Sequence, residues 1–183
     1  MALAIRLDPI TPDDLPLLCC WRNSATFRGF CSKRREPVSE VEFQSELQRD
    51  LATDRLEQMM IRKSDDEPIG TIFAYGYCRA DGYLFVSAFV EDHSRCKGYG
   101  AIAFSSFART LFERYDLYKI YADVYEHNHT VTSQLLRSGL VCEGKFKGHR
   151  REGDARYSLF RLALYRDALE QAITKLEQRG RTK

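Results

Sequence analysis

Residues 94–103, SRCKGYGAIA, place two glycines between a basic run and an apolar run. Gly98 and Gly100 have no Cβ, so a ligand can approach their backbone closely and a positive φ is accessible. An amphipathic helix is predicted to follow, because apolar side chains recur at helical spacing over residues 104–112. The first N–H groups of a helix lack partners, and the helix dipole is positive there. The stretch therefore predicts either a pyrophosphate site or a helix start with nothing bound.

A dinucleotide site is the main alternative for this stretch. GYGAIA, residues 98–103, fits the pattern G-x-G-x-x-A, and Asp123 lies about 20 residues further on. In a dinucleotide fold the first glycine follows a strand almost directly, whereas here EDHSRCK, residues 91–97, comes after Val90. The segments before it also resemble an antiparallel meander rather than the start of a βαβ unit. This context disfavours a nicotinamide site.

The remaining pattern predicts one mixed α/β domain. Turn residues in DDEP and RADG separate strand-like segments rich in β-formers, which indicates an antiparallel meander. Ser39 and Glu42 form a capping box at the start of a helix. Strands are expected at residues 3–10, 55–64, 68–78, 83–90, 117–126 and 155–165, and helices at 11–23, 39–51, 98–112, 130–140 and 166–178.

The composition of the chain limits the classes of protein to which it can belong. The chain has 183 residues, 44% of them hydrophobic, which is enough for one domain with a sizeable core. Lys and Arg exceed Asp and Glu by only two, which gives no electrostatic case for a nucleic-acid or membrane partner. No apolar run reaches the ~18 residues of a membrane span, and the N-terminus lacks signal-peptide features. We therefore expect a cytoplasmic protein.

Cysteine and histidine spacing indicates neither a disulfide framework nor a metal site. The six cysteines include no C-x-x-C pair, so reduced thiols are the expected state. His127 and His129 stand two residues apart, but no third ligand follows at a recognisable spacing.

Arg95, Gly98 and Gly100, after a strand and at the start of a helix, resemble the acetyl-CoA loop of the GNAT N-acetyltransferases. In that family a strand follows, and then an Asn that starts the next helix. IYADVYEHN, residues 120–128, supplies both here. LVCEGKFKG, residues 140–148, is similar to a turn in the branch that contains the ribosomal-protein N-terminal acetyltransferases, which acetylases of amino sugars and antibiotics share.

The same branch is matched by two further segments, WRN at 21–23 and YSLFRLALYRD at 157–167. The resemblance thus spans nearly the whole chain. It predicts a GNAT acetyltransferase domain over residues 1–167, with 168–183 forming a C-terminal helix and basic tail of the same domain. The fold it implies is α/β, with a mostly antiparallel central sheet that has a splay, and with helices on both faces.

The resemblance implies acetyl-CoA as co-substrate, with no metal. The pantetheine arm would pair with strand edges at residues 89–90 and 121–124, and a backbone N–H within 88–90 would stabilise the oxyanion. Asn128 would bind the cofactor arm, cap the next helix, or do both. The implied cofactor-binding residues are Phe89, Val90, Arg95, Cys96, Lys97, Gly98, Tyr99, Gly100, Ala101 and Asn128.

The usual acid–base residues of the family do not carry over to this sequence. Phe85 lies where many members have a Glu, Leu135 where many have a Tyr, and Val131 where the related branch often has a Ser. Water could instead relay the proton from an acceptor whose pKa the site lowers. The candidate bases are His149 and Glu91, and the candidate acids are Ser133 and Tyr125; each also fits an ordinary surface, loop or helix position.

The acceptor pocket in this family forms from the first two helices and the loop before the last strand. Its candidate residues are Trp21, Arg22, Asn23 and Phe30, although Trp21 also fits a plain core position. The loop KFKGHRREGDAR, residues 145–156, is basic and would suit an acidic or phosphorylated acceptor such as a sugar nucleotide. It also fits a solvated hairpin.

We therefore predict an N-acetyltransferase that moves an acetyl group from acetyl-CoA to a primary amine by direct attack. The amine would belong to a protein N-terminus, an amino sugar or an antibiotic. The alternative is a non-catalytic acyl-CoA-binding module with a sensor or assembly role. The expected partners are acetyl-CoA and a small-molecule or peptide amine, and the expected state is a monomer or homodimer.

Overall fold

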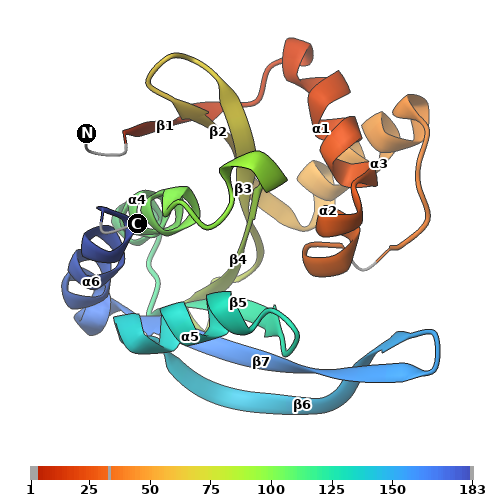
Figure 1. Cartoon of the computed structure of the whole chain (residues 1–183). Coiled ribbons are helices and arrows are strands. Elements are labelled where there is room, and N and C mark those ends of the chain that lie inside the picture. Colours follow the sequence, from red (N-terminus) through yellow and green to blue (C-terminus); the bar gives the residue numbers. More distant parts are fainter. Residues whose placement is uncertain (1–3, 33, 182–183) are drawn as a thin grey trace.

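A twisted sheet lies between two layers of helices in the computed structural model, which describes residues 4–32 and 34–181 (Figure 1). The strand order is β1-β2-β3-β4-β5-β7-β6, and every neighbouring pair is antiparallel except β4 and β5. The strands are β1 (Ile5–Pro9), β2 (Arg55–Lys63), β3 (Pro68–Cys78), β4 (Tyr83–Val90), β5 (Lys119–Tyr125), β6 (Val141–Glu152) and β7 (Ala155–Tyr165).

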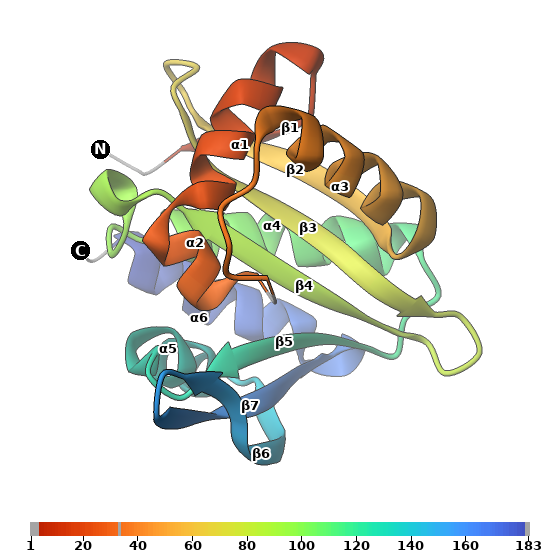
Figure 2. The ribbon, with the colours of Figure 1, turned by 90° about the vertical axis from the view of Figure 1, so that its right-hand side faces the viewer.

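Each face of the sheet carries its own apolar core, because successive side chains of a strand point to opposite faces. Met60 and Ile61 of β2 are both fully buried, but they belong to different cores. One face is covered by α1 (Leu15–Asn23), α2 (Ala25–Phe30) and α3 (Glu40–Thr53), and the other by α4 (Tyr99–Arg114), α5 (His129–Ser138) and α6 (Leu169–Arg181) (Figures 1 and 2).

The predicted fold class is confirmed. The meander forms as β2, β3 and β4, and the apolar side chains at helical spacing after the glycine pair become the buried face of α4. The capping box of Ser39 and Glu42 is present at the start of α3. The long periodic segments thus fold as their patterns predict.

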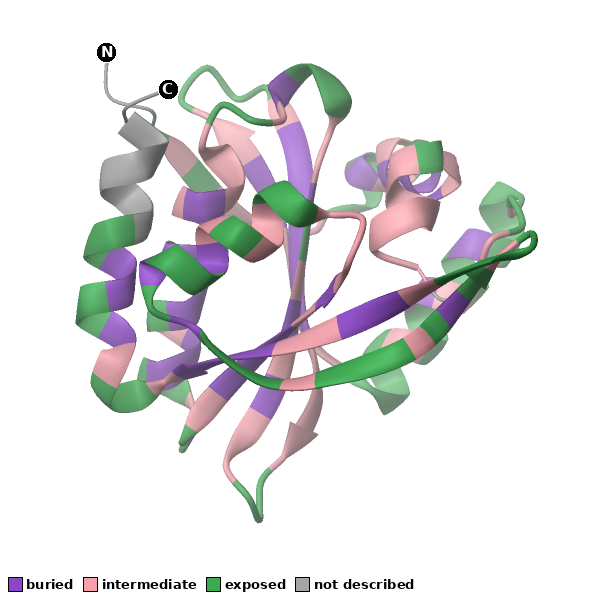
Figure 3. Ribbon diagram, turned by 60° about the horizontal axis from the view of Figure 1, so that its bottom comes forward, coloured by how far each residue is buried: buried purple, intermediate pink, exposed green. Residues whose placement is uncertain are grey.

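Two elements, α2 and β6, were absent from the predicted order. None of the six residues of α2 is buried, so this helix has no apolar stripe to identify it. Residues 145–156, read as a loop or a solvated hairpin, form the β6–β7 hairpin, and His149 therefore lies on a strand. β6 is an edge strand whose residues are mostly exposed (Figure 3). Charged residues are typical of such edges, and they hide the strand pattern.

The C-terminal helix packs against the rest of the domain. α6 contacts α4, α5 and β7, and an ion pair of 3.3 Å joins Arg109 of α4 to Glu170 of α6. The helix begins at Leu169, after a short 3-10 turn, and continues to Arg181, beyond the predicted end at 178. Residues 182–183, the end of the predicted basic tail, lie outside the described residues.

The central feature of the sheet is the separation of β4 from β5. These parallel strands pair only at Tyr83–Lys119, Leu84–Ile120 and Phe85–Tyr121. Beyond these pairs the strands diverge toward α2 and α5 (Figure 2). The predicted splay is therefore confirmed, and residues 86–90 and 122–125 face each other without pairing.

Gly70 allows β3 and β4 to approach closely beside this gap, because an added Cβ would meet the carbonyl oxygen of Phe89 at 2.1 Å. We expect Gly70→Ala to lower the free energy of unfolding by about 1–3 kcal/mol, since the backbone must shift. At Gly29 in α2 an added Cβ meets nothing within 4 Å. Gly29→Ala should therefore leave stability unchanged or raise it by up to about 1 kcal/mol. Urea unfolding measures both, and equal values for the two variants would contradict the packing at Gly70.

Candidate active site

The gap between β4 and β5 opens into a cavity of about 200 Å³. Its walls come from both strands, from α2, and from the first turns of α4 and α5. Three of the predicted cofactor-binding residues do not line this cavity, namely Cys96, Lys97 and Tyr99. The predicted residues that do are Phe89, Val90, Arg95, Gly98, Gly100, Ala101 and Asn128.

The register of β3 and β4 determines which backbone groups face this cavity. The N–H of Glu91 donates to the carbonyl of Ile69 on β3 at 2.9 Å. Hydrogen-bonded and non-hydrogen-bonded pairs alternate along an antiparallel ladder, so Ala88 and Val90 direct their N–H and C=O groups away from β3. The thiol of Cys31 donates to the carbonyl of Ala88 at 3.6 Å, which agrees with this orientation. β4 therefore directs the peptide groups of these two residues toward the gap, where the Ala88 carbonyl accepts from Cys31.

The glycine loop concentrates unpaired donors at one end of the cavity. Cys96 and Gly98 have φ values of 60° and 98°, and α4 begins at the next residue, Tyr99. Within the described ranges, the amide N–H groups of residues 96–100 have no backbone or side-chain acceptor. A non-glycine residue at positive φ is uncommon, and such strained positions gather at functional sites. The loop fits a pyrophosphate, which would receive these N–H groups at the positive end of α4.

Helix α2 is attached to this loop by two contacts. The Thr26 hydroxyl donates to Asp92 at 2.8 Å, and Asp92 lies 3.5 Å from the guanidinium of Arg95. The same guanidinium lies 5.1 Å from the centre of the Phe30 ring, within cation–π range. These contacts place the positive charge of Arg95 at the cavity beside the free N–H groups.

A second cavity, of about 400 Å³, lies on the face covered by α1, α2 and α3. Of the predicted acceptor residues, Arg22 and Phe30 line it, whereas Trp21 and Asn23 do not. Trp21 is 5% exposed and packs against the ring of Phe89, so it lies in the core on this face of the sheet. The Asn23 amide exchanges hydrogen bonds of 2.8 and 2.9 Å with the backbone of Val38, and it thereby anchors the segment before α3.

The two cavities share part of their walls. The residues that line both of them, which we call the junction, are Phe30, Cys31, Ser87, Asp123 and Tyr125. Sequence reasoning missed three of these as site residues: Cys31, Ser87 and Asp123. A signal was present, since Ser87 and Asp123 are polar residues inside otherwise apolar strand segments. Asp123 receives two hydrogen bonds from Arg161, at 2.9 and 2.8 Å, so its carboxylate is held in place.

The four candidate proton-transfer residues have different positions. Tyr125 belongs to the junction, and the Arg150 guanidinium lies 4.6 Å from the centre of its ring. His149 is exposed and lines the second cavity. Glu91 and Ser133 line neither cavity; Glu91 instead accepts a hydrogen bond from the Ser94 hydroxyl at 3.4 Å, and Ser133 is exposed on α5. The structure thus brings Tyr125 and His149 to the site, and leaves Glu91 and Ser133 outside it.

Within residues 4–32 and 34–181, no cluster of three or more potential metal ligands occurs, and His127 packs against the rings of Phe30, Tyr125 and Tyr157. Among the described helices, none combines the length and apolar character that a bilayer span requires. All six cysteines fall within the described residues and are unpaired.

The model of the acetyltransferase (GNAT) domain family matches residues 4–141, more than half of the chain. The protein therefore belongs to the GNAT acetyltransferase family. This membership confirms the sequence-based prediction of an acetyl-CoA-dependent N-acetyltransferase at the level of the family.

Solved structures share this fold at low sequence identity. A spermidine N-acetyltransferase from Vibrio cholerae, in complex with CoA and spermine, has a TM-score of 0.81 and 14% identity, over 92% of this chain and 98% of that one. A GNAT-family acetyltransferase from Bacillus anthracis has a TM-score of 0.73 and 13% identity, over 91% and 98%. A putative phosphinothricin N-acetyltransferase has a TM-score of 0.72 and 17% identity, over 88% and 98%. No curated protein sequence matches the chain.

Cys31 provides a chemical test of the junction. Burial raises the pKa of its thiol to about 11, against weaker opposing effects of Ser87, Arg95 and Arg150. The thiolate is the reactive form, so at pH 8 only about one Cys31 in a thousand is reactive. We expect iodoacetamide to modify the exposed Cys96 and Cys142 well before Cys31, as followed by peptide mass spectrometry. Labelling of Cys31 at the rate of Cys142 would contradict the burial of the junction.

Proposed function

We propose that the enzyme transfers an acetyl group from acetyl-CoA to a primary amine at the junction, by direct attack of the amine on the thioester. The observation that carries this proposal is that the cavity at the gap between β4 and β5 and the cavity beside α1 and α3 share the junction residues. The donor enters through the gap between β4 and β5, and the acceptor enters from the side of α1 and α3. The reacting atoms then meet where both cavities end.

The donor cavity suits each part of coenzyme A. The free N–H groups of residues 96–100 would bind the pyrophosphate, with the positive charge of Arg95 beside them. The amides of the pantetheine arm would pair with the peptide groups that Ala88 and Val90 direct into the gap. One of these N–H groups would then stabilise the oxyanion of the tetrahedral intermediate. Asn128 lines the same cavity from the start of α5 and would contact the arm.

Proton transfer would use groups at opposite ends of the acceptor path. The departing thiolate gains a proton and the attacking amine loses one. Tyr125 is at the junction and would donate to the thiolate, while His149 at the cavity wall would accept the amine proton through water. Because Asp123 is bound by Arg161, it would orient the amine rather than remove its proton.

The finer predictions remain part of this proposal. A protein N-terminus, an amino sugar and an antibiotic amine are the candidate acceptors, in keeping with the predicted branch of the ribosomal-protein N-terminal acetyltransferases. The cytoplasmic location, the monomeric or homodimeric state and the domain division at residue 167 stay predictions. A non-catalytic acyl-CoA-binding module is the second candidate, which the apolar Val131 and Leu135 on the donor-cavity wall favour.

Gly98→Val tests the donor site, because a side chain at this left-handed position strains the loop and hinders the approach of the pyrophosphate. We expect at least a tenfold loss of CoA affinity in titration calorimetry, in a protein that remains folded. Gly153→Val is the matched control, since Gly153 also has a positive φ but lies in the β6–β7 turn. Unchanged CoA affinity in Gly98→Val would show that the loop does not bind the pyrophosphate.

A panel of amines tests catalysis. We expect amine-dependent release of free thiol from acetyl-CoA with at least one primary amine, measured with a thiol reagent against a no-amine control. With that amine, Tyr125→Phe should lower kcat by about 10²-fold and leave CoA affinity unchanged, because the loss falls on proton transfer. CoA binding without turnover of any amine would instead favour the non-catalytic module. Failure to bind CoA would overturn both candidates.

A further inference from the structure

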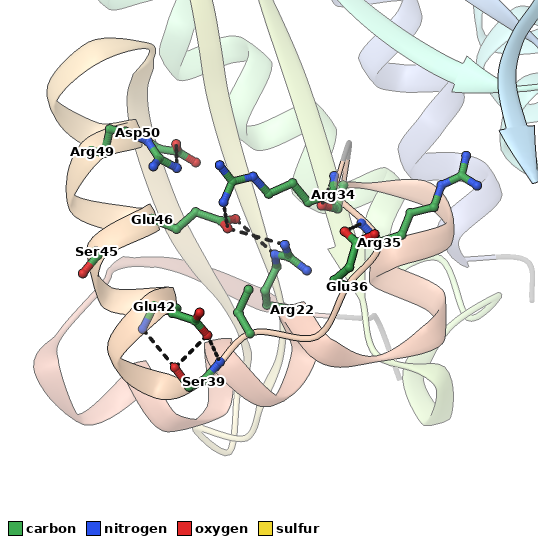
Figure 4. A network of polar contacts seen from close by, with 12 residues as sticks. Arg22, Arg34, Arg35, Glu36, Ser39, Glu42, Ser45, Glu46, Arg49 and Asp50 are labelled. Carbon is green, nitrogen blue, oxygen red and sulfur yellow. Dashed lines mark hydrogen bonds and ion pairs between the residues drawn. The ribbon is translucent and has the colours of Figure 1, made fainter.

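Arg22 of α1 is a buried cation with unused hydrogen-bonding capacity. Its side chain is only 3% exposed, and its Nε and Nη2 atoms donate to the carboxylate of Glu46 on α3 at 3.1 and 3.4 Å (Figure 4). Its Nη1 is buried and has no partner among the described residues. Leaving a buried charged donor unpaired is costly, so this atom is suited to a further acceptor. Arg22 lines the acceptor cavity.

Arg34 brings a second, accessible cation to the same carboxylate. Its side chain is 61% exposed, and its Nη1 lies 3.5 Å from Glu46. Figure 4 shows Arg22 and Arg34 converging on Glu46 from different segments. A guanidinium carries five N–H donors, so one shared carboxylate leaves most of the donors of this pair unused. The Arg22–Arg34 pair therefore carries two positive charges against the single negative charge of Glu46.

The carboxylates of the acceptor cavity are already engaged, which distinguishes it from a site for a polycation. Asp50 binds Arg55 at 3.0 Å, and Asp123 binds Arg161. Asp54 accepts the backbone N–H of Gly76 at 3.1 Å. A polycationic acceptor would have to compete with Arg55 and Arg161 for Asp50 and Asp123, whereas an anionic group would take up unused N–H donors.

We propose that the acceptor amine also carries an anionic group, a carboxylate or a phosphate, which binds the Arg22–Arg34 pair. Arginine forks match both anions in bidentate geometry, which favours this ligand class. The cavity continues from this pair to Phe30 and Cys31, so the amine lies at the junction while the anion lies toward α1 and α3. The inference rests on the proposed function, because it specifies the acceptor of that reaction.

Matched ligands test the anion site directly. Glucosamine 6-phosphate is compared with glucosamine, and glycylglycine with its amide, by calorimetry on the full chain saturated with CoA so that the donor loop is already filled. We expect the anionic member of at least one pair to bind about tenfold more tightly. A preference in the first pair identifies a phosphate, and one in the second a carboxylate.

Substitution of the arginines shows where the anion binds. Arg22→Gln and Arg34→Gln should each reduce the preference to less than about threefold. Arg34 is largely exposed, so Arg34→Gln keeps the test valid if Arg22→Gln fails to fold. Arg79→Gln, at an exposed turn between β3 and β4, is the matched control and should retain the full preference.

Turnover of the same pairs separates this inference from the proposed function. Thiol release that is equally efficient with neutral and anionic amines, or faster with spermidine, would overturn the anion site and leave the acetyltransferase proposal intact. Equal binding within both pairs would also overturn it. Selective binding of an anionic amine without any turnover would support the anion site and contradict the catalytic proposal.

Discussion

The separation of two parallel strands after three paired residues determines the rest of this molecule. Hydrogen bonding holds β4 and β5 together at their first residues, and their later peptide groups have no strand partner across the gap. Unpaired backbone groups inside a protein are costly unless another group binds them. The sheet tolerates the gap because β3 and β7 hold the outer edges of both strands, while α4 and α5 close it on one side. The result is a slot lined by backbone, which an extended molecule with amides can fill.

Such a slot separates the chemistry of the donor from that of the acceptor. In the proposed function, peptide groups and helix N–H groups would bind the donor, so few particular side chains would be required there. The acceptor side is built from side chains of α1, α2 and α3, among which arginines and carboxylates are paired in a fixed pattern. Changes in α1 and α3, which do not line the gap between β4 and β5, would therefore alter the acceptor without altering the walls of the donor slot.

Periodic burial of apolar side chains made much of the fold predictable. Where this period is absent, the prediction missed an element. α4 and the meander have apolar faces that the sequence displays directly, whereas α2 and β6 bury almost nothing and show no period. Gly98 and Asn128, which line the first cavity, were predicted as binding residues because the glycine pair and the family resemblance point to them. Cys31 and Ser87 were not, because their meeting depends on where β4 and β5 separate, and Asp123 was considered only for a dinucleotide site. The family resemblance predicted the separation, but which side chains meet beside it depends on the register and packing of the whole sheet, which local spacing does not give.

The attachment of α2 to the glycine loop has a consequence for how the two substrates affect each other. Arg95 contacts both Asp92 and the ring of Phe30, and Phe30 also belongs to the wall of the acceptor cavity. In the proposed function, a phosphate that recruits Arg95 would compete with these contacts and would thereby alter the acceptor wall. Thermodynamic linkage would then require that occupancy of the acceptor cavity change donor affinity by the same factor. One arginine would in this way couple the binding of donor and acceptor.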